Sequence, residues 1–588
     1  MSPYGRIASA DKRQGQAQAM IDRKMETDVL VIGGGGGGLR AAIAADAAGA
    51  RVMVVSKGIV GKSGLTQTAV TGFQVALGNA DPRDNPDVHF NDSMRGSYGV
   101  ADPELVRIFT QEAHTAVEDI EAFGARFDRD ENGQLIQRAL DSSQTYPRSL
   151  RKGDSLGTPI MQALRKQAKK RNISCLHEIL VTKLLVDGDR VNGAVALDFR
   201  TGELLHIAAK AVIMATGGGA EIFPVHSNTP DATGDGCILA LEAGADLVDM
   251  EFVLMLGHAV LYPEPVRGVL FTYQYLLPKG ARSPYNADGE PFLAKYDPEG
   301  SDNPARHIYA RAIFGEVRAG RGSPHGGVFF DPASVSPQTL HETLPSQTNL
   351  LETLGVDMTK PIEVGVAAHY FCGGIKIGPH GNSSLAGLYA VGECSGGPHG
   401  AARVGGNSLT EVLVFGKRAG KHAAESVAAA PAIRPDGEAI EAECARLAEC
   451  LATAGDGPQP ADIIDDLKKA MGDNVGVVRN ADGLRQAALD LRALETDQLQ
   501  RMALTNHDRV ANYQWVQAIE ARTMVRLGRV VAAAALERTE SRGAHFREDF
   551  EQQNDAEWQR NIIVQGRDGD FTLRRSAIVS GEILKKAG

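Results

Sequence analysis

Six consecutive glycines, Gly33 to Gly38, constrain the fold of this chain more than any other feature of its sequence. A β-branched, apolar stretch from Thr27 to Ile32 precedes them, and an alanine-rich helical stretch follows. A second apolar strand is expected from Arg51 to Val55. Strand, glycine-rich turn, helix and strand within about thirty residues predict a βαβ unit.

Three of these glycines occupy the G-x-G-x-x-G positions of a dinucleotide-binding loop. Gly33 permits the tight turn, Gly35 lets the backbone approach a pyrophosphate, and Gly38 allows the helix to pack closely on the strand. The N-terminus of the helix adds N–H donors and a favourable dipole for phosphates. The first region of the chain is therefore predicted to bind a dinucleotide.

The residues after the second strand distinguish between dinucleotides. They read Ser56-Lys57 and lack the carboxylate that usually holds the ribose of NAD, which disfavours NAD. Three further segments follow in order: Ala215–Gly218 after a predicted strand, Thr233–Gly236, and Gly387–Glu393. An extended FAD needs a distant segment to close over its ribityl and isoalloxazine parts, and this ordered set is typical of two-segment FAD domains. FAD is the predicted cofactor.

Composition excludes several other classes of function. The 588 residues carry a formal charge of -11, whereas nucleic-acid binders usually have a basic excess. No apolar run approaches the roughly 18 residues that span a bilayer, and residues 1–24 lack a signal-peptide core, so a cytoplasmic protein is expected. The six cysteines form no C-x-x-C pair, which leaves no sequence case for a zinc or iron–sulfur site.

Two long strings in the C-terminal half are more specific: HGAARVGGNSL at His399–Leu409 and ESRGAHFREDF at Glu540–Phe550. Shorter stretches accompany them at Ser56-Lys57, Val75–Asn79, Thr233–Gly236, Asp249–Val253, Ala368–Ile375 and Ala390–Glu393. With these stretches the chain resembles, from about residue 26 to its end, the flavoprotein subunits of succinate dehydrogenase and fumarate reductase. L-aspartate oxidase belongs to the same superfamily and stays open as an alternative.

The resemblance implies an α/β fold with a Rossmann-like, two-segment FAD-binding domain, an inserted capping domain, a C-terminal helical domain and a small C-terminal tail domain. Residues 262–305 are rich in Pro, Gly, Tyr and Asn without a clear period, as an irregular insertion would be. The expected boundaries are a polar tail at 1–25, FAD-binding segments at 26–250 and 352–430, a capping domain at 251–351, a helical domain at 431–545 and a terminal segment at 546–588.

The resemblance also implies an active site. His369 and Arg403 would hold a substrate carboxylate, for which the planar fork of arginine is well suited. Hydride would pass between flavin N5 and one carbon, with Arg306 as acid or base at the neighbouring carbon, although a shifted alignment would exchange it with Arg311. The residues predicted to bind the cofactor are Gly33, Gly35, Gly38, Ser56, Lys57, Lys62, Ser63, Gly64, Thr216, Gly217, Asp235, Glu393, Arg403, Asn407, Ser408 and Leu409.

Two departures from the family pattern concern histidines. Respiratory members attach FAD covalently to a histidine, but Gly64 stands at that position here, so FAD is expected to be noncovalent. The family's His-Pro-Thr-Gly is replaced by Leu254-Met255-Leu256-Gly257-His258. His258 either substitutes for the missing ligand, two positions late, or is a packed core histidine, and the sequence leaves these alternatives equal.

A third departure concerns the substrate. The family's Thr-Glu-Gly…Arg-Gly-Glu-Gly segment, which binds one carboxylate and feeds protons to the catalytic arginine, is absent, and the region reads Phe271–Gly280. A pocket lined by Tyr273, Tyr275, Leu276 and Leu277 would be too apolar for a second carboxylate. The expected substrate bears a C=C or CH–CH unit beside one carboxylate and is not plain succinate or fumarate.

Other classes of function remain open alongside this reductase hypothesis. An amino-acid or hydroxy-acid oxidase on the same scaffold is the alternative, and a non-catalytic electron-transfer flavoprotein is the second. Because the chain supplies no cluster ligands, electrons are expected to come from a separate iron–sulfur or other electron-carrier subunit, through which the protein would associate with a membrane if at all.

Overall fold

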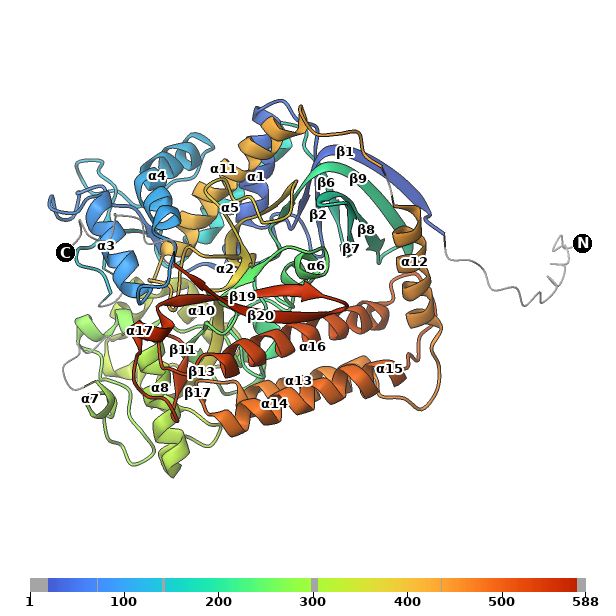
Figure 1. Cartoon of the computed structure of the whole chain (residues 1–588). Helices are drawn as coiled ribbons and strands as arrows, with labels where there is room; N and C mark the ends of the chain where they lie inside the picture. The colour runs from blue at the N-terminus through green and yellow to red at the C-terminus, as the bar shows by residue number, and fades with distance from the viewer. Residues whose placement is uncertain (1–19, 71, 140–142, 298–304, 435, 579–588) are drawn as a thin grey trace, which may run out of the picture.

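The computed structural model describes residues 20–70, 72–139, 143–297, 305–434 and 436–578, so parts of the expected tail and terminal segment lie outside the described residues (Figure 1). The largest sheet has the order β6 (Ser174–His177), β2 (Val52–Ser56), β1 (Arg23–Ile32), β9 (Glu203–Met214), β8 (Arg190–Asp198) and β7 (Ile179–Asp187), with β15 (Leu388–Ala390) also on β9. Strands β6, β2, β1, β9 and β15 run parallel, whereas β8 and β7 are antiparallel additions.

The parallel register brings the carboxyl ends of three strands to one edge of this sheet. Ile32 pairs with Val55 on one side and with Met214 on the other. The glycine-rich turn, Ser56 and the residues after Met214 therefore meet at that edge, where ligands of open α/β sheets bind. The expected strands at Thr27–Ile32, Arg51–Val55, 211–215 and 388–391 are all present, with small shifts at their ends.

Helices cover this sheet, and glycine makes the closest contact possible. A Cβ at Gly38 would collide with the carbonyl oxygen of Gly33, which confirms the packing role expected for Gly38. Helix α4 begins as expected, since the Asp102 side chain accepts a hydrogen bond from the backbone N–H of Glu104 at 2.9 Å. The helices are α1 (Gly36–Ala47), α2 (Leu65–Thr68), α3 (Pro86–Gly96), α4 (Pro103–Ala122), α5 (Gly157–Lys170), α6 (Asp235–Glu242) and α11 (Asn407–Val427), beside a small sheet of β3 (Phe73–Gln74), β5 (Ser149–Leu150) and β4 (Gln137–Arg138).

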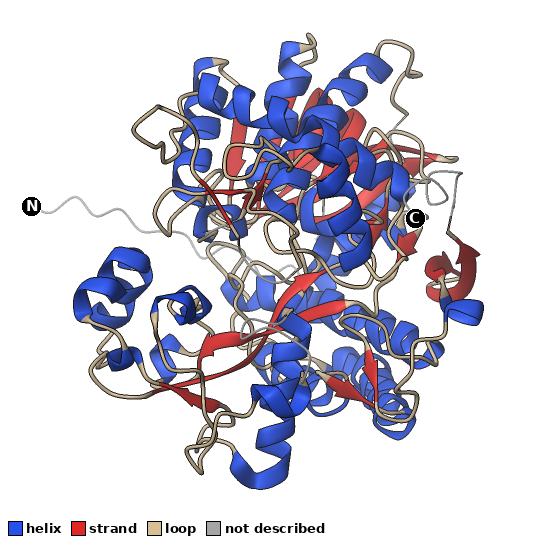
Figure 2. Cartoon of the chain, turned by 90° about the vertical axis from the view of Figure 1, so that its left-hand side faces the viewer, coloured by secondary structure: helices blue, strands red, loops and turns tan. Residues whose placement is uncertain are grey.

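The inserted capping domain has a hydrophobic core of its own, which includes Val260, Phe271, Tyr309, Val328 and Val364. It forms the separate green and lime lobe of Figure 1, and the two lobes face each other in Figure 2. The first part of the insertion is irregular, as its composition predicts, but helices follow. Its elements are β11 (Val253–Val260), α7 (Leu293–Tyr296), α8 (Arg306–Glu316), β12 (Val328–Phe330), α9 (Pro337–Thr343), α10 (Pro345–Thr353) and β13 (Ile362–Phe371), with the sheet order β11-β13-β12.

The C-terminal part combines a helical domain with a hairpin that extends a sheet of the FAD domain. The helices are α12 (Gly437–Ala452), α13 (Pro460–Asn474), α14 (Ala481–Ala493), α15 (Leu499–Arg501), α16 (Tyr513–Glu537) and α17 (Asp555–Trp558). The sheet runs β16 (Ser395–Gly396), β14 (Gly374–Lys376), β10 (Leu247–Val248), β19 (Arg560–Arg567) and β20 (Asp570–Ala577), and a further pair joins β17 (Val478–Arg479) to β18 (Phe546–Arg547). None of the helices among the described residues is long and apolar enough to cross a membrane.

The ESRGAHFREDF string is a buried ion network that holds the C-terminal part on the FAD domain. Arg538 contacts Glu251 at 2.7 Å and Glu540 at 3.1 Å, and Glu540 also receives Arg542 at 2.6 Å. Both arginines and Glu540 are almost fully buried. Removing one partner of such a network leaves a buried charge uncompensated. The string therefore acts in the assembly of the domains, at a distance from the cavity described next.

Candidate active site

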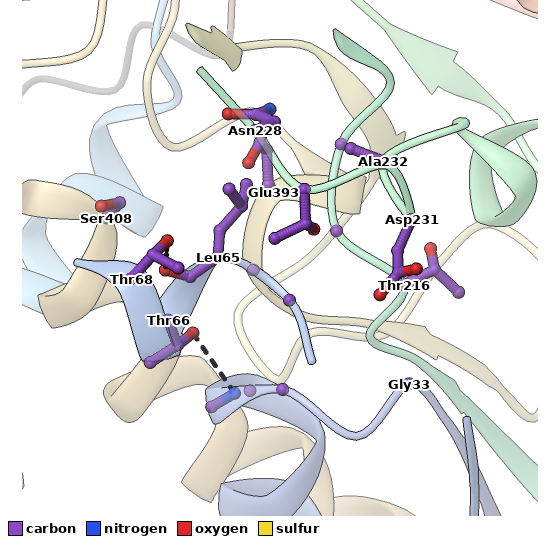
Figure 3. A pocket seen from close by; sticks show the side chains of 18 of the residues that line it. Gly33, Leu65, Thr66, Thr68, Thr216, Asn228, Asp231, Ala232, Glu393 and Ser408 are labelled. Carbon is purple, nitrogen blue, oxygen red and sulfur yellow. Dashed lines mark hydrogen bonds between the residues drawn. The ribbon is translucent and has the colours of Figure 1, made fainter. Parts of the chain in front are cut away.

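One long cavity runs from the glycine-rich turn, along the edge of the main sheet, to the capping domain. Segments far apart in the sequence line it: the glycine-rich turn, residues 63–70, 215–218 and 227–235, the capping domain, and residues 391–412. Figure 3 shows side chains from several of these segments pointing toward one another, among them Thr68, Asn228, Glu393 and Ser408. The cavity has a dinucleotide end at the turn and a substrate end against the capping domain.

The dinucleotide end fits FAD. A Cβ at Gly35 would meet no protein atom within 4 Å, and the same is true at Gly64 and Gly217, all of which line the cavity. The backbone of these residues can thus approach a ligand closely. The N-terminus of α1 opens here without a side-chain cap at Gly35, and the Gly36 N–H donates to Thr66 Oγ1 at 3.3 Å (Figure 3). Donors and dipole both suit a pyrophosphate.

Thirteen of the sixteen predicted cofactor residues line this cavity, and three do not. Gly38 lies behind the turn, in its packing role. Lys62 is exposed to solvent. The side chain of Asn407 is held by His89 Nε2 at 2.8 Å and donates to Ser93 Oγ at 2.9 Å, so it joins α11 to α3. For Lys62 and Asn407 the expectation of a direct contact with FAD is corrected, because both were inferred from neighbours in sequence that do reach the cavity.

Lys57 lines the cavity, but its ammonium group is already paired. Its Nζ donates to Thr233 Oγ1 and to the carboxylates of Asp235 and Glu520, at 2.7, 2.9 and 2.7 Å. Burial alone would lower the pKa of Lys57, but Asp235 and Glu520 outweigh it and raise that pKa. Glu520 lies on α16, so this cluster ties the dinucleotide end to the helical domain.

The substrate end contains a buried arginine without an acidic partner. Arg403 is 7% exposed, its guanidinium lies 4.1 Å from the centre of the Tyr370 ring, and it donates to the carbonyl of Val404 at 3.3 Å. No carboxylate among the described residues forms a salt bridge with it. Burial, and then the nearby charge of Arg306, lower the pKa of Arg403. A buried cation of this kind is stabilised when an anion binds beside it.

His369 lies next to Arg403 and is oriented by Ser227. Its Nε2 is 3.4 Å from Arg403 Nη2, and its Nδ1 is 2.8 Å from Ser227 Oγ. A guanidinium only donates, so Nε2 accepts and the proton is assigned to Nδ1, which donates to Ser227. The Ser227 hydroxyl in turn donates to the carbonyl of Ala368 at 3.4 Å. Burial, reinforced by Arg306 and Arg403, lowers the pKa of His369 far below its usual value, so the ring is neutral.

His258 proves to be both packed and part of the cavity wall. Its ring stacks on Tyr309 with centres 4.8 Å apart and planes 13° apart, and it lines the cavity beside Arg306 and His369. Its Nε2 is buried without a hydrogen-bond partner among the described residues. Burial, and then the charge of Arg306, lower the pKa of His258 to about 3. A neutral histidine with a free ring nitrogen can donate to, or accept from, a bound ligand.

The structure separates the two candidate arginines of α8. Arg306, at the first turn, lines the cavity. Arg311 is absent from the cavity wall, and its guanidinium lies 4.7 Å from the centre of the Phe546 ring. Five residues of helix turn the side chain through about 500°, so the two arginines leave α8 in different directions. Arg306 is the arginine that can reach a ligand in the cavity.

The expected apolar lining of the substrate end is wrong. None of Tyr273, Tyr275, Leu276 and Leu277 lines the cavity, whereas Thr272 and Gln274 do. Tyr273 instead points into the core of the capping domain, where its hydroxyl lies 2.6 Å from that of Tyr309 and 3.0 Å from the carbonyl of Gly257. The segment forms short 3-10 turns, in which neighbouring side chains point in different directions, so its apolar composition does not describe the face toward the cavity.

Sequence reasoning missed four polar residues of the cavity wall. Thr272 and Gln274 were hidden among aromatic residues. Ser227 and Asn228 precede the Thr233-Gly234 motif, and the only signal for them was a short run of small polar residues at that point. Both side-chain polar atoms of Asn228 are buried without a partner among the described residues. Across those residues, no group of three or more His, Cys, Asp or Glu side chains could hold a metal ion.

Comparison with known proteins defines the class first. The chain matches the FAD binding domain family over residues 28–409 and the fumarate reductase flavoprotein C-terminal family over residues 464–586. It is an FAD-dependent oxidoreductase by this match, and its domain order is the one that the resemblance implies.

Whole-chain relatives identify the family. The chain is 40% identical to a fumarate reductase (CoM/CoB) subunit of Methanothermobacter marburgensis, over 92% of this chain and 97% of that protein. It is 33% identical to the fumarate reductase flavoprotein subunit of Escherichia coli, over 93% of each chain. The structure of Mycobacterium smegmatis Sdh1 in complex with UQ1 superposes with a TM-score of 0.85 at 35% identity, covering 94% of this chain and 95% of that one. The chain belongs to the succinate dehydrogenase/fumarate reductase flavoprotein family.

Proposed function

We propose that this protein transfers hydride between FAD and a C=C or CH–CH unit beside a carboxylate in a small organic acid. The observation that carries the proposal is Arg403, a buried arginine on the cavity wall without an acidic partner among the described residues. Arg306 lies at the same end of the cavity, and His258 and His369 are uncharged there. Two guanidiniums beside two neutral imidazoles suit an acid with one or two carboxylates.

Bound FAD would supply hydride, or accept it, at N5. Arg403 and His369 would hold a carboxylate of the substrate, so that the adjacent carbon faces the flavin. Arg306 would donate a proton to the second carbon of the double bond, or remove it in the reverse direction. Thr272, Gln274 and Asn228 offer neutral hydrogen bonds to the rest of the substrate.

Fumarate is the first substrate to test. The expectation of a substrate other than succinate or fumarate depended on an apolar lining by Tyr273 and its neighbours. With Thr272 and Gln274 on the cavity wall, burying a second carboxylate there no longer lacks hydrogen-bond donors. The M. marburgensis relative is named a fumarate reductase, which favours the same choice.

Noncovalent attachment of FAD is part of the proposal. Gly64 lines the cavity at the position of the family's attachment histidine and has no side chain that could form a bond. Acid precipitation should therefore release all of the flavin into the supernatant. Flavin fluorescence that stays with the denatured polypeptide would contradict this.

We further propose that a separate electron carrier, such as an iron–sulfur subunit, exchanges electrons with the flavin. The described residues contain no group of metal ligands, so the chain supplies no cluster of its own there. The M. marburgensis relative is named as a subunit, and its name contains CoM/CoB. Co-purification of the native protein, followed by iron and labile sulfide analysis, tests for such a partner.

The decisive experiment is reoxidation of the dithionite-reduced protein, followed by the recovery of flavin absorbance. Fumarate and a panel of other unsaturated acids should reoxidise the flavin, and Arg306→Ala should abolish the effect. If no acid reoxidises the wild type, a non-catalytic electron-transfer flavoprotein becomes the better account. L-aspartate oxidase of Streptomyces coelicolor is 32% identical over 92% of this chain. Reduction of the oxidised flavin by amino or hydroxy acids, with reoxidation by oxygen, would favour that alternative.

A further inference from the structure

A buried carboxylate of the FAD domain holds the capping domain next to the substrate end of the cavity. Asp154 is 3% exposed and lies just before α5. Its carboxylate accepts hydrogen bonds from the backbone N–H groups of Ser346 and Gln347, at 3.0 and 3.1 Å. Both donors belong to the first turn of α10, so Asp154 caps a helix of the other domain. Capping residues normally precede their own helix, whereas this one lies about 190 residues away in sequence.

Gln347 extends this contact to the cavity wall. Its Nε2 lies 3.4 Å from Asp154 Oδ2 and 3.0 Å from Thr272 Oγ1. Its Oε1 accepts a hydrogen bond from the Thr272 backbone N–H at 2.7 Å. Asp154 and Gln347 are almost fully buried, and Thr272 is 9% exposed. A continuous chain of hydrogen bonds therefore runs from the FAD domain, through α10, to a residue that faces the cavity.

A second contact fixes the other side of the same segment. The guanidinium of Arg138, on β4 of the FAD domain, lies 4.6 Å from the centre of the Tyr275 ring. Thr272 and Tyr275 are thus both held from the FAD domain, with Gln274 between them. Gln274 is 5% exposed, lines the cavity, and its Oε1 has no hydrogen-bond partner among the described residues. An unpaired buried amide oxygen is costly unless a ligand donates to it.

We propose that Asp154 is a positioning residue for the reaction: by docking α10, it sets through Gln347 where Thr272 and Gln274 meet the substrate. The proposal rests on the proposed function for the nature of that substrate. It assigns the 272–275 segment, where the family pattern is lost, to coupling between the domains. Asp154 itself does not line the cavity and acts only through other residues.

The first test compares Asp154→Ala with wild type in the fumarate-dependent reoxidation of reduced flavin. KM for fumarate should rise about tenfold, the size of a lost hydrogen bond to a charged group, with a smaller fall in kcat. Flavin content should stay unchanged. Asp154→Asn, which keeps one carbonyl oxygen and the shape of the side chain, should fall between the two and serves if the alanine variant does not fold. Asp331→Ala is the matched control, since Asp331 accepts the Ala333 N–H within the capping domain and should leave KM unchanged.

Gln347 provides a test that a merely structural role would not satisfy. Gln347→Glu places a second carboxylate against Asp154, beside the same Arg138 guanidinium, and like charges at this distance favour protonation of one of them. Its KM should exceed that of Gln347→Ala at pH 8 and fall back toward it as the pH is lowered to 6. The double variant Asp154→Ala/Gln347→Ala should be no worse than the worse single variant, because both break one chain of contacts.

Two outcomes would overturn the proposal: a KM for Asp154→Ala within twofold of wild type, or parallel pH profiles for Gln347→Glu and Gln347→Ala. Failure of the proposed function looks different, because wild type itself would then reduce no acid. In that case the same variants are compared by titration with malonate, a dicarboxylate that cannot be reduced, monitored through flavin absorbance. Weaker malonate binding by Asp154→Ala supports the positioning role, and unchanged binding overturns it.

Discussion

The two ends of the cavity are built in different ways. At the dinucleotide end, the backbone makes most of the site: Gly33, Gly35 and the first turn of α1 are contiguous in sequence and present N–H groups to the ligand. At the substrate end, single side chains such as Arg306, His369 and Arg403 arrive from separate elements. The first arrangement depends on local conformation, whereas the second depends on how two domains dock. The substrate end should therefore tolerate less change in packing and allow more change in specificity.

The largest effect is expected from Arg306→Lys. Lysine keeps the charge but loses the planar fork and the reach of the guanidinium. Without a correctly placed acid, kcat should fall by about 10²–10⁴-fold, while flavin content stays unchanged. Stopped-flow reoxidation by fumarate measures this directly.

Arg311→Lys is the matched control for this prediction. It lies on the same helix but stacks on Phe546, off the cavity, and should leave kcat within about twofold of wild type. Equal losses in both variants would mean that α8 contributes to catalysis through its stability alone. A larger loss at Arg311 would reverse the assignment of the two residues.

The next largest effect tests the dinucleotide end, at its tie to the helical domain. Lys57→Met would leave Asp235 and Glu520 facing each other without their shared cation. Removing one partner of a buried cluster costs about 3 kcal/mol, so the free energy of unfolding in urea should fall by that amount. Lys62→Met, at a neighbouring exposed lysine, is the control and should leave it unchanged. If Lys57→Met weakened FAD binding without changing stability, the ammonium group would be a direct ligand after all.

The sequence predicted the dinucleotide end well because its signals are local. Gly33, Gly35 and Gly38 could be assigned separate roles from spacing alone, and the structure places each accordingly. Lys62 and Asn407 were wrong for the reverse reason: adjacency in sequence does not decide which way a side chain points. At the substrate end, the resemblance supplied Arg306, His369 and Arg403, which composition and spacing could not have brought together.

The errors at the substrate end have one physical cause. Residues 271–280 form short 3-10 turns without a regular period, so no pattern separates the face toward the cavity from the face toward the core. Tyr273 is directed into the core and Gln274 into the cavity, although they are neighbours. The partners that fix Thr272, Asp154 and Gln347, are on two different domains, and no sequence signal links them.

A smaller effect is expected from a buried carboxyl beside the cavity. Glu411 is fully buried, and burial raises its pKa to about 7. Because the folded state then holds a proton that the unfolded chain releases near its ordinary pKa of 4.5, this contribution to stability is lost as the pH rises from about 4.5 through 7. Relative to Glu411→Gln, wild type should lose about 2 kcal/mol of unfolding free energy between pH 5 and 8. Urea titrations at both pH values measure this, with the exposed Glu131→Gln as a control that should follow wild type.

The smallest predicted effect sharpens the comparison most, because it concerns a hydroxyl whose role is to orient a side chain of the site. In the structure, His369 carries its proton on Nδ1 and presents the lone pair of Nε2 to Arg403. A substrate carboxylate needs a donor at Nε2 instead. Ser227 allows the exchange, because its hydroxyl can rotate from accepting to donating without any movement of the ring.

Ser227→Ala removes this partner and should raise KM for fumarate about tenfold, with little change in kcat, since one hydrogen bond that orients the ring is lost. Ser227→Thr keeps the hydroxyl and should restore most of the affinity, which a loss of packing would not predict. A KM unchanged in Ser227→Ala would show that Arg403 alone orients the carboxylate. The substrate end would then depend, like the dinucleotide end, on a few groups fixed by the fold and not on side chains that orient one another.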